Sequence, residues 1–295
     1  MKRKELLRIL VGWGFTFTVA VLLLILSDSK PYQILELKAL DLRFNLRGSR
    51  PTDVDLLHID IDDESLDKLG RWPWPRSYHA KLIDILAECG AKKVLMDILF
   101  TERLKDNPED DVAFARAQSR SGIVYLPFYF LEDKQPPPPE LKELLDKDIT
   151  VSVEDAQTEL NAGDDLLQDI LPLAKKYVMD EAVRGLVRKN PDIKEDDLIS
   201  AIEESKEWYL FAEEEAYIRG NLESYKLARF FVNKFAIDYQ KQGFLKLKEY
   251  NRLSAPIREY IESIKGTGYI NADPDQDGVM RRVPLFIKYE DRMFA

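Results

Sequence analysis

The chain has 295 residues, of which 45% are hydrophobic and 33% are charged, and its formal net charge at pH 7 is −10. The hydrophobic share is sufficient for a sizeable buried core, which excludes an intrinsically disordered protein. The acidic balance excludes nucleic acid from the expected partners, because binding to phosphates requires clustered Lys and Arg. With a single cysteine, Cys89, the chain has no intramolecular disulfide framework.

The N-terminus combines a basic start with an uncharged apolar run. Residues 1–8 read MKRKELLR, and residues 9–26 read ILVGWGFTFTVAVLLLIL. A helix of this length spans a hydrocarbon core of about 30 Å. The run is longer than the apolar region of most signal peptides, and no A-x-A cleavage pattern follows it. We therefore expect a retained transmembrane helix, with residues 1–8 cytoplasmic and the chain after about residue 28 on the extracytoplasmic side of the inner membrane.

Residues 34–154 alternate between helix-like and strand-like patterns and form the first part of the predicted extracytoplasmic domain. The predicted elements, in chain order, are a helix at 34–48, a strand at 55–62, a helix at 76–89, a strand at 93–100, a helix at 109–121 and a strand at 123–131. This order predicts parallel strands joined by right-handed crossovers, which together form an α/β sheet.

The second half of the chain contains two segments with different sequence patterns. Residues 155–250 carry apolar residues at helical spacing with charge on the opposite face, and they predict an all-helical insertion. Residues 251–295 return to strand patterns around an acidic turn and predict an antiparallel hairpin. The predicted fold class is α/β: a mixed, mainly parallel sheet flanked by helices, with a C-terminal antiparallel hairpin, an all-helical insertion and an N-terminal transmembrane helix.

The stretch GRWPWPRS interleaves tryptophan with proline just before a predicted helix. Each proline biases the residue before it, Trp72 or Trp74, toward an extended conformation. Side chains two residues apart in an extended stretch share one face, so both indoles are predicted to cover the end of the sheet. Ser77 is placed to cap the helix. We interpret the stretch as a rigid corner that helps to form a crevice.

Acidic residues close the first predicted strand. Asp60 and Asp62 lie at its end, and Asp97 lies in the second strand of the same predicted sheet. Ligands of open α/β sheets bind outside the carboxyl ends of strands, so these residues, with Arg76 and Arg281, predict a ligand crevice. Apposed carboxylates repel one another and would favour calcium or magnesium, although no cofactor is required. The alternative is that the carboxylates cap the turn and helix that follow.

The stretch DPDQDG, residues 273–278, is a second acidic cluster. Its spacing of Asp273, Asp275 and Asp277 matches the first half of an EF-hand calcium loop. The twelfth position of such a loop would be Pro284 instead of glutamate, and the flanks are strands. A hairpin turn rich in Asp and Gly is therefore the alternative to a metal site.

Arg281 and Arg282 follow this turn on adjacent positions of a predicted strand, so their side chains are expected to point to opposite faces. A covered arginine requires a carboxylate partner. The sequence offers Asp60 or Asp97 as that partner of Arg281, and a clamp on an anionic ligand is the alternative.

Four blocks of the sequence, in order, resemble a known family. DLRFNLRG, IDIDDESLDKLGRWPWPRSYHAKLIDIL, GAKKVLMDILFTE and GYINADPDQDGVMRRVPL are similar to the second class of the CHASE family, the cyclase- and histidine-kinase-associated extracellular sensory domains. The likeness covers residues 37–131 and 253–288. Its structural signatures are Asp41, Arg43, Trp72, Pro73, Trp74 and Gly278.

This resemblance implies the sensory part of a longer bacterial receptor and not an enzyme. Such receptors have an N-terminal anchor, an extracytoplasmic sensor, usually three further membrane helices and a cytoplasmic output, which is an adenylate or guanylate cyclase, a histidine kinase or a serine/threonine kinase. The expected partners are the membrane, a small-molecule or protein ligand of unknown identity, and a second copy of the chain. Two alternative functions stay open: a metal-dependent hydrolase that uses Asp60 and Asp62, and a protein-interaction platform formed by residues 155–250.

Overall fold

The computed structural model describes residues 12–19, 21–22, 29–51, 54–131, 136–161, 164–238, 247–275, 277–281, 283–290 and 292–294. The chain divides into two compact units. The first unit is Met1–Leu69 with Ala272–Val283, and the second unit is Gly70–Asn271 with Pro284–Ala295.

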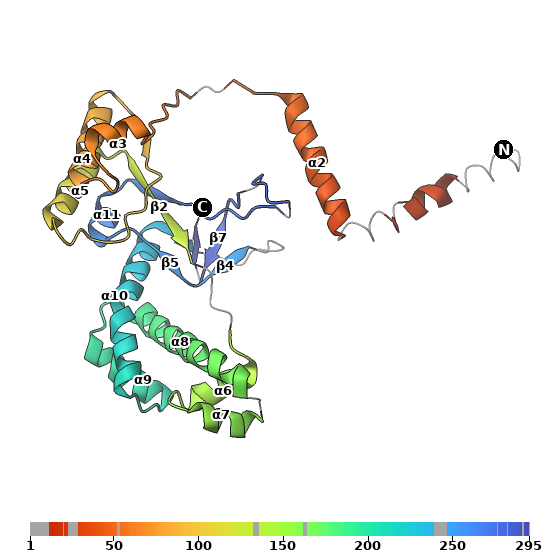
Figure 1. Cartoon of the computed structure of the whole chain (residues 1–295), viewed down its shortest axis with the longest axis vertical. Coiled ribbons are helices and arrows are strands. Elements are labelled where there is room, and N and C mark those ends of the chain that lie inside the picture. The colour runs from red at the N-terminus through yellow and green to blue at the C-terminus, as the bar shows by residue number, and fades with distance from the viewer. Residues whose placement is uncertain are drawn as a thin grey trace, which may run out of the picture. The chain divides into compact units, whose positions relative to one another are not determined.

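The long helix of the first unit is α2 (Lys30–Arg47), drawn as a regular helix in Figure 1. A proline in its first turn suits the helix start, where the missing N–H has no intrahelical partner. The helix ends at Gly48, which has a φ of 68° and donates its N–H to the Phe44 carbonyl. Glycine tolerates this left-handed conformation, so the sequence itself terminates α2.

Residues 55–62, which the sequence predicts as a strand, form no β-ladder and precede the short helix α3 (Asp63–Leu69). Leu56 and Leu57 are 85% and 78% exposed, so the apolar pattern of this segment is not buried against a sheet. The prediction of a parallel pair between this segment and the next strand is therefore wrong in this structure.

The first sheet lies in the second unit. Its strands are β1 (Val94–Leu95), β2 (Val124–Phe130), β5 (Leu253–Ser254) and β6 (Gly266–Tyr269). β2 is parallel to β1 and to β6, and its last two residues are antiparallel to β5. Gly266 lies against the Tyr125 ring, where an added Cβ would approach to 2.6 Å, so the β2–β6 pairing requires glycine there.

Three helices pack with this sheet: α4 (Arg76–Glu88), α5 (Pro108–Ser121) and α11 (Arg258–Ser263). Their apolar faces share one core with β2, and its fully buried members include Ile83, Phe100, Phe114, Leu126 and Tyr260. The mixed α/β class and the mainly parallel sheet are confirmed in this part of the chain.

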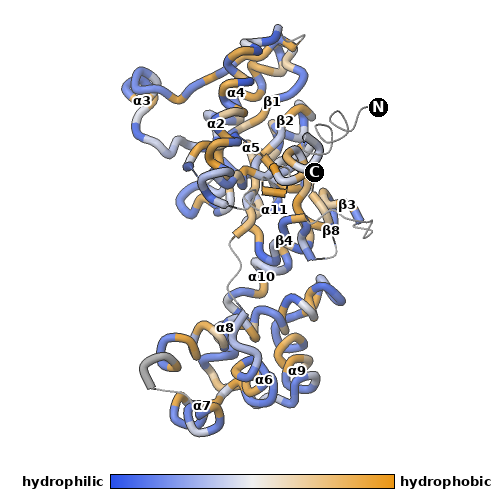
Figure 2. Tube along the Cα trace, turned by 90° about the vertical axis from the view of Figure 1, so that its right-hand side faces the viewer, coloured by the Kyte–Doolittle hydropathy of each residue, from blue (hydrophilic) through white to orange (hydrophobic). Residues whose placement is uncertain are grey.

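The helical region contains α6 (Pro139–Lys147), α7 (Val153–Leu160), α8 (Asp164–Lys189), α9 (Glu195–Lys206) and α10 (Ala212–Phe235). Hydrophobic and hydrophilic residues alternate along these helices in Figure 2, as expected for helices with one buried face. Helix α10 belongs to two cores. Its first half buries Ile218 and Leu222 among the helices, and its second half buries Phe231 and Val232 against a second sheet.

The second sheet consists of β3 (Ile237–Asp238), β4 (Lys248–Tyr250), β7 (Ile287–Tyr289) and β8 (Arg292–Phe294), in the order β3-β8-β7-β4. The sequence predicts one hairpin on the edge of a single sheet. Instead, β6 joins the first sheet, and the antiparallel pair is β7 with β8. Aromatic packing explains the second sheet, because the Phe294 ring lies 4.8 Å from Phe128 and 5.7 Å from Phe231, between centroids.

The predicted membrane span, residues 9–26, lies partly outside the described residues. The described parts of it, residues 12–19 and 21–22, are helical. Within the described portions of the chain, no helix combines the length and the apolar character needed to cross a membrane.

Candidate functional site

In the Trp-Pro corner only one of the two indoles predicted to be covered is buried, because Trp74 is 9% exposed and Trp72 is 41% exposed. The Trp74 indole N–H donates to the Gly70 carbonyl at 2.8 Å, and Trp72 meets Trp74 edge-to-face with 5.8 Å between ring centroids. The first residue of α4 is Arg76, and Pro75 before it supplies no side-chain cap, so Ser77 is not the capping residue. Ser77 instead donates its hydroxyl to Asp110 Oδ2 at 3.2 Å, which joins α4 to the start of α5.

Arg76, a predicted ligand residue, lies in a buried cluster. Its Nε is 3.6 Å from Asp111 Oδ1, and its guanidinium stacks over the Phe100 ring at 4.4 Å. Asp111 is 4% exposed and accepts hydrogen bonds from the Tyr260 hydroxyl and the Leu104 N–H. Burial, and the hydrogen bond to Asp111, raise the pKa of Tyr260 well above its usual range. The cluster therefore holds one cation against one carboxylate.

His79 borders this cluster and is 3% exposed. Burial, together with the positive charge of Arg76, lowers its pKa to about 4. The imidazole is therefore neutral at pH 7. Its ring contacts Phe100 and Phe114 with centroid distances of 5.5 and 5.8 Å, which makes it a core residue.

The acidic residues predicted to close the first strand have separate partners. Asp62 Oδ1 accepts from the Ser65 N–H at 2.9 Å and from the Ser65 hydroxyl at 2.6 Å, and these bonds lower the pKa of Asp62. This is the capping alternative, because the bonds lie at the start of α3. Asp60 is exposed and lies 3.3 Å from the His58 imidazole, and Asp97 is exposed after β1.

Arg281 forms the densest ionic cluster of the first unit, although its side chain is only 6% exposed. Its guanidinium donates to both oxygens of Asp41, at 2.6 and 2.7 Å, and to both oxygens of Asp277, at 2.7 and 2.8 Å. A third carboxylate, Asp275, accepts at 3.2 Å. These hydrogen bonds raise the pKa of Arg281 above its usual range and lower the pKa of Asp41 and of Asp277. We name this set the Arg281 clasp.

The clasp corrects the expected partner of Arg281. Arg281 has a carboxylate partner, as predicted, but the partner is Asp41 of α2 and the turn itself, and not Asp60 or Asp97. The turn closes through the Gly278 N–H, which donates to the Asp275 carbonyl at 2.8 Å. Among the described residues, no group of three His, Cys, Asp or Glu side chains is placed to hold a metal ion. The cation at this turn is the guanidinium. Arg282 lies outside the described residues.

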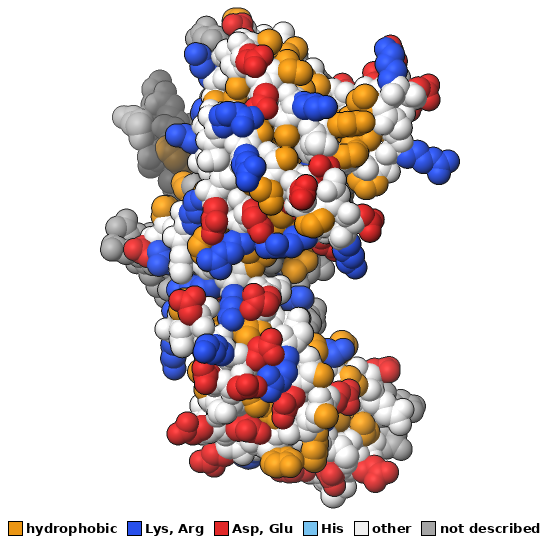
Figure 3. All heavy atoms as spheres, turned by 90° about the vertical axis from the view of Figure 1, so that its left-hand side faces the viewer, with side chains coloured by type: hydrophobic (Ala, Val, Ile, Leu, Met, Phe, Trp, Pro, Cys, Tyr) orange, Lys and Arg blue, Asp and Glu red, His pale blue; other side chains and the backbone are white. Residues whose placement is uncertain are grey.

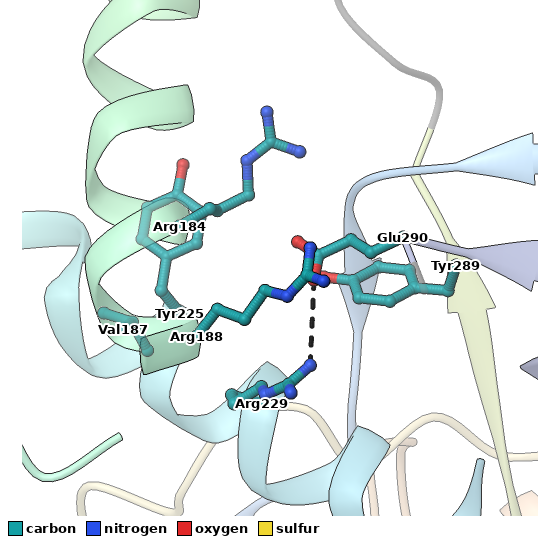
Figure 4. A pocket seen from close by; sticks show the side chains of 7 residues that line it. All are labelled: Arg184, Val187, Arg188, Tyr225, Arg229, Tyr289 and Glu290. Atoms are coloured by element: carbon teal, nitrogen blue, oxygen red, sulfur yellow. Dashed lines mark ion pairs between the residues drawn. The ribbon is translucent and has the colours of Figure 1, made fainter. Parts of the chain in front are cut away.

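A pocket that the sequence did not indicate lies in the second unit. It is a small hollow of about 10 Å³, and it is lined by Arg184, Val187, Arg188, Tyr225, Arg229, Tyr289 and Glu290. Figure 4 shows that these side chains come from α8, from α10 and from the end of β7, and that Arg229 is paired with Glu290. We name it the arginine pocket.

Helical spacing is the only sequence signal for the arginine pocket. Arg184 and Arg188 are four residues apart on α8, as Tyr225 and Arg229 are on α10, so each pair shares a helix face. Which faces would meet is decided by tertiary packing. Burial raises the pKa of Tyr225 far above its usual range, and the neighbouring Asp180 raises it further, so this phenol stays protonated.

The comparisons with known proteins decide the family. The family model described as CHASE2 domain matches residues 17–295. The chain belongs to the CHASE2 domain family. CHASE2 is an extracellular sensory family, which supports a sensory role for this chain, and the resemblance carried by the four sequence blocks is confirmed. No curated protein and no solved structure matches the chain significantly.

The surface of this CHASE2 domain shows no segregation of charge on the face drawn in Figure 3. Acidic and basic side chains are interspersed across the described residues of that face.

Proposed function

We propose that this CHASE2 domain is the extracytoplasmic signal-input part of a bacterial receptor, which controls a cytoplasmic nucleotide cyclase. The observation that carries the proposal is the CHASE2 match over residues 17–295. The N-terminal apolar run supports an anchor in the inner membrane, because its described helical part exposes Trp13, Phe15 and Phe17 by 72, 72 and 71%. Apolar surface of this kind is stable in lipid and unfavourable in water.

The route of the signal in this proposal is α2. The helix follows the apolar run in the chain, and Asp41 on α2 is held by Arg281 near the other end of the domain's sequence. A signal that alters the position of α2 requires two states of the domain with different affinity for the stimulus. The clasp supports this route, since it is a set of discrete hydrogen bonds that can be made in one state and broken in another.

The expected homodimer also involves α2. Leu35, Ala39, Leu42 and Leu46 are all exposed and recur at spacings of four, three and four residues. This is the spacing of a coiled-coil seam, and a second copy of α2 offers the same seam in return. We therefore propose that two α2 helices pair along these four residues.

The side of the membrane is testable with a native residue. Cys89 is the only cysteine of the sequence and is exposed. A membrane-impermeant maleimide should label Cys89 in spheroplasts with an intact inner membrane, and Cys89→Ser should abolish the labelling. Labelling that appears only after the membrane is lysed would contradict the proposed topology.

The signalling route is testable in membranes that carry the complete receptor. Asp41→Asn weakens the clasp without changing side-chain size, so we expect a changed basal cyclase activity and a reduced response to stimulus. Glu36→Gln, an exposed site on the same helix, is the matched control and should behave as the parent receptor. Equal cyclase output from Asp41→Asn and the parent would exclude the clasp from the signal route.

A further inference from the structure

The first sheet has a free edge at β1. Within the described part of the chain, β1 lies at the end of the strand order β1-β2-β5 and pairs on one side only. On that side, the N–H groups of Val94 and Met96 donate to backbone carbonyl oxygens at 2.9 and 3.1 Å. Successive backbone groups of a strand point to opposite edges, so those of Leu95 and Asp97 point away from β2. This edge can therefore accept one more strand.

The apolar side chains along this edge are incompletely covered. Val94, Met96 and Ile98 pack against the core that α4, α5 and α11 share with β2, but they are only partly buried. On the opposite face, Leu95 is 75% exposed and Leu99 is 40% exposed. A strand added beside β1 would cover apolar surface on both faces, and the gain is proportional to the apolar area that is removed from water.

Residues 55–62 have the pattern of a strand but form no β-ladder in this structure. Leu57, Ile59 and Ile61 alternate with polar residues and are 78%, 49% and 41% exposed. Side chains two residues apart in an extended segment share one face, so these three residues form an apolar face in water. We name residues 55–62 the free segment. A partner that offers a sheet edge would satisfy its backbone and bury this face.

An antiparallel register matches the free segment to the edge of β1 on the side that faces the core. When Ile59 lies opposite Met96, the period of two residues fixes all other pairs. Every pair on the core side is then apolar: Leu57 with Ile98, Ile59 with Met96, and Ile61 with Val94. Directly opposed side chains are the pairs that stabilise a sheet, so this register uses the apolar face of the free segment completely.

The same register also fits on the outer face. It sets Leu56, which is 85% exposed, opposite Leu99, and it sets the imidazole of His58 opposite the carboxylate of Asp97. Asp60 lies opposite Leu95 on this outer face, where its carboxylate stays in water. The exposed contact between His58 and Asp60 does not oppose the rearrangement, because ion pairs between exposed side chains contribute little stability.

The charges favour a strand from another copy of the chain. A segment that precedes β1 through a helical crossover in the same chain would form a parallel pair. With the apolar face toward the core, the parallel register sets Asp60 opposite Asp97, and like charges directly opposite each other are destabilising. The antiparallel register avoids this repulsion, and a second copy can supply a strand in that direction.

We propose that the free segment of one chain docks antiparallel on the edge of β1 in a second copy of the chain. Two copies related by a two-fold axis exchange the segment reciprocally, so that each copy donates one strand and receives one. The inference rests on the homodimer in the proposed function and adds to it a surface that is separate from the α2 seam.

The test is disulfide formation between two differently tagged full-length chains that are expressed in the same membrane, both with Cys89→Ser. One chain carries His58→Cys and the other carries Asp97→Cys. The proposed register sets these positions directly opposite each other, within the Cα separation of about 4.4–6.8 Å that a disulfide requires. Oxidation with copper phenanthroline should produce a covalent dimer that contains both tags. Absence of this mixed dimer would overturn the proposal.

The matched control replaces His58→Cys with Asp60→Cys, because Asp60 is also exposed and lies two residues away on the same face. In the proposed register Asp60 is diagonal to Asp97, at about 7–8 Å, so the yield of mixed dimer should fall at least fivefold. An equal or higher yield with Asp60→Cys would overturn the antiparallel register and the proposal with it.

A single chain that carries both His58→Cys and Asp97→Cys distinguishes exchange between copies from pairing within one chain. We expect covalent dimers on a non-reducing gel. A disulfide-closed monomer in place of these dimers would overturn the proposal. Crosslinking requires no output domain, so its failure refutes strand exchange and leaves the proposed sensory function standing.

A charge on the apolar face of the free segment provides an independent variant. Ile59→Asp, combined with the cysteine pair, should lower the yield of mixed dimer at least tenfold, because it sets a carboxylate opposite Met96. Leu173→Asp on α8 is the matched control, since Leu173 is 61% exposed and lies outside the proposed surface. Circular dichroism reports whether each variant folds. An unchanged yield in folded Ile59→Asp would overturn the proposal.

Discussion

The two arginine-centred sites of this CHASE2 domain differ in how completely their charge is matched. In the Arg281 clasp, one guanidinium donates to three carboxylates, and both Asp41 and Asp277 receive paired bonds. In the arginine pocket, three guanidinium groups share one lining carboxylate. A saturated arginine has no donors left for a ligand and can only hold structure together.

The largest expected effect comes from a third arginine site, the buried ion pair of Arg76 with Asp111. Asp111→Ala leaves the covered Arg76 without its carboxylate and removes the acceptor of the Tyr260 hydroxyl. Loss of one partner from a buried pair costs about 3–5 kcal/mol of unfolding free energy. Urea unfolding followed by circular dichroism measures this cost. If Asp111→Ala were as stable as the parent, charge matching would not determine stability in this domain.

The clasp should show a clear but smaller loss of stability. Arg281→Gln removes the bonds to Asp41, Asp275 and Asp277 and leaves three carboxylates close together, which repel one another. We expect a melting temperature several degrees below that of the parent in differential scanning calorimetry. Arg43→Gln is the matched control, because Arg43 is exposed on α2 and donates to its own helix at Ala39.

The sequence predicted that Arg281 has a carboxylate partner, but it did not predict which residue supplies that carboxylate. A carboxylate partner was expected because a buried arginine without one is unfavourable. One such partner, Asp277, lies only four residues before Arg281. Asp41 lies 240 residues away, and no local pattern points to it. The arginine pocket was missed for the same reason, because Arg184 and Glu290 are brought together only by packing of α8 against the turn after β7.

The fold shows the same division between local and tertiary information. The α/β class, the helices α4 and α5 and the strand β2 follow from local periodicity and are present. The β-pattern at residues 55–62 predicted a strand that does not form, since a strand also requires a partner that periodicity cannot supply. The second sheet depends on the aromatic contacts of Phe294 with Phe128 and Phe231, which link distant parts of the sequence. The family was recognisable because its four blocks are contiguous motifs.

Acid provides a finer test of the clasp. Hydrogen bonds from Arg281 lower the pKa of Asp41 and of Asp277 below their unfolded value of about 3.9. The unfolded chain therefore takes up these protons first as the pH falls. The contribution of the clasp is fully present above about pH 4 and is lost below it. Between about pH 5 and pH 3, the urea midpoint of the parent should fall more steeply than that of Arg281→Gln. If the urea midpoints of the parent and of Arg281→Gln fell equally with pH, the clasp would not favour the ionised carboxylates.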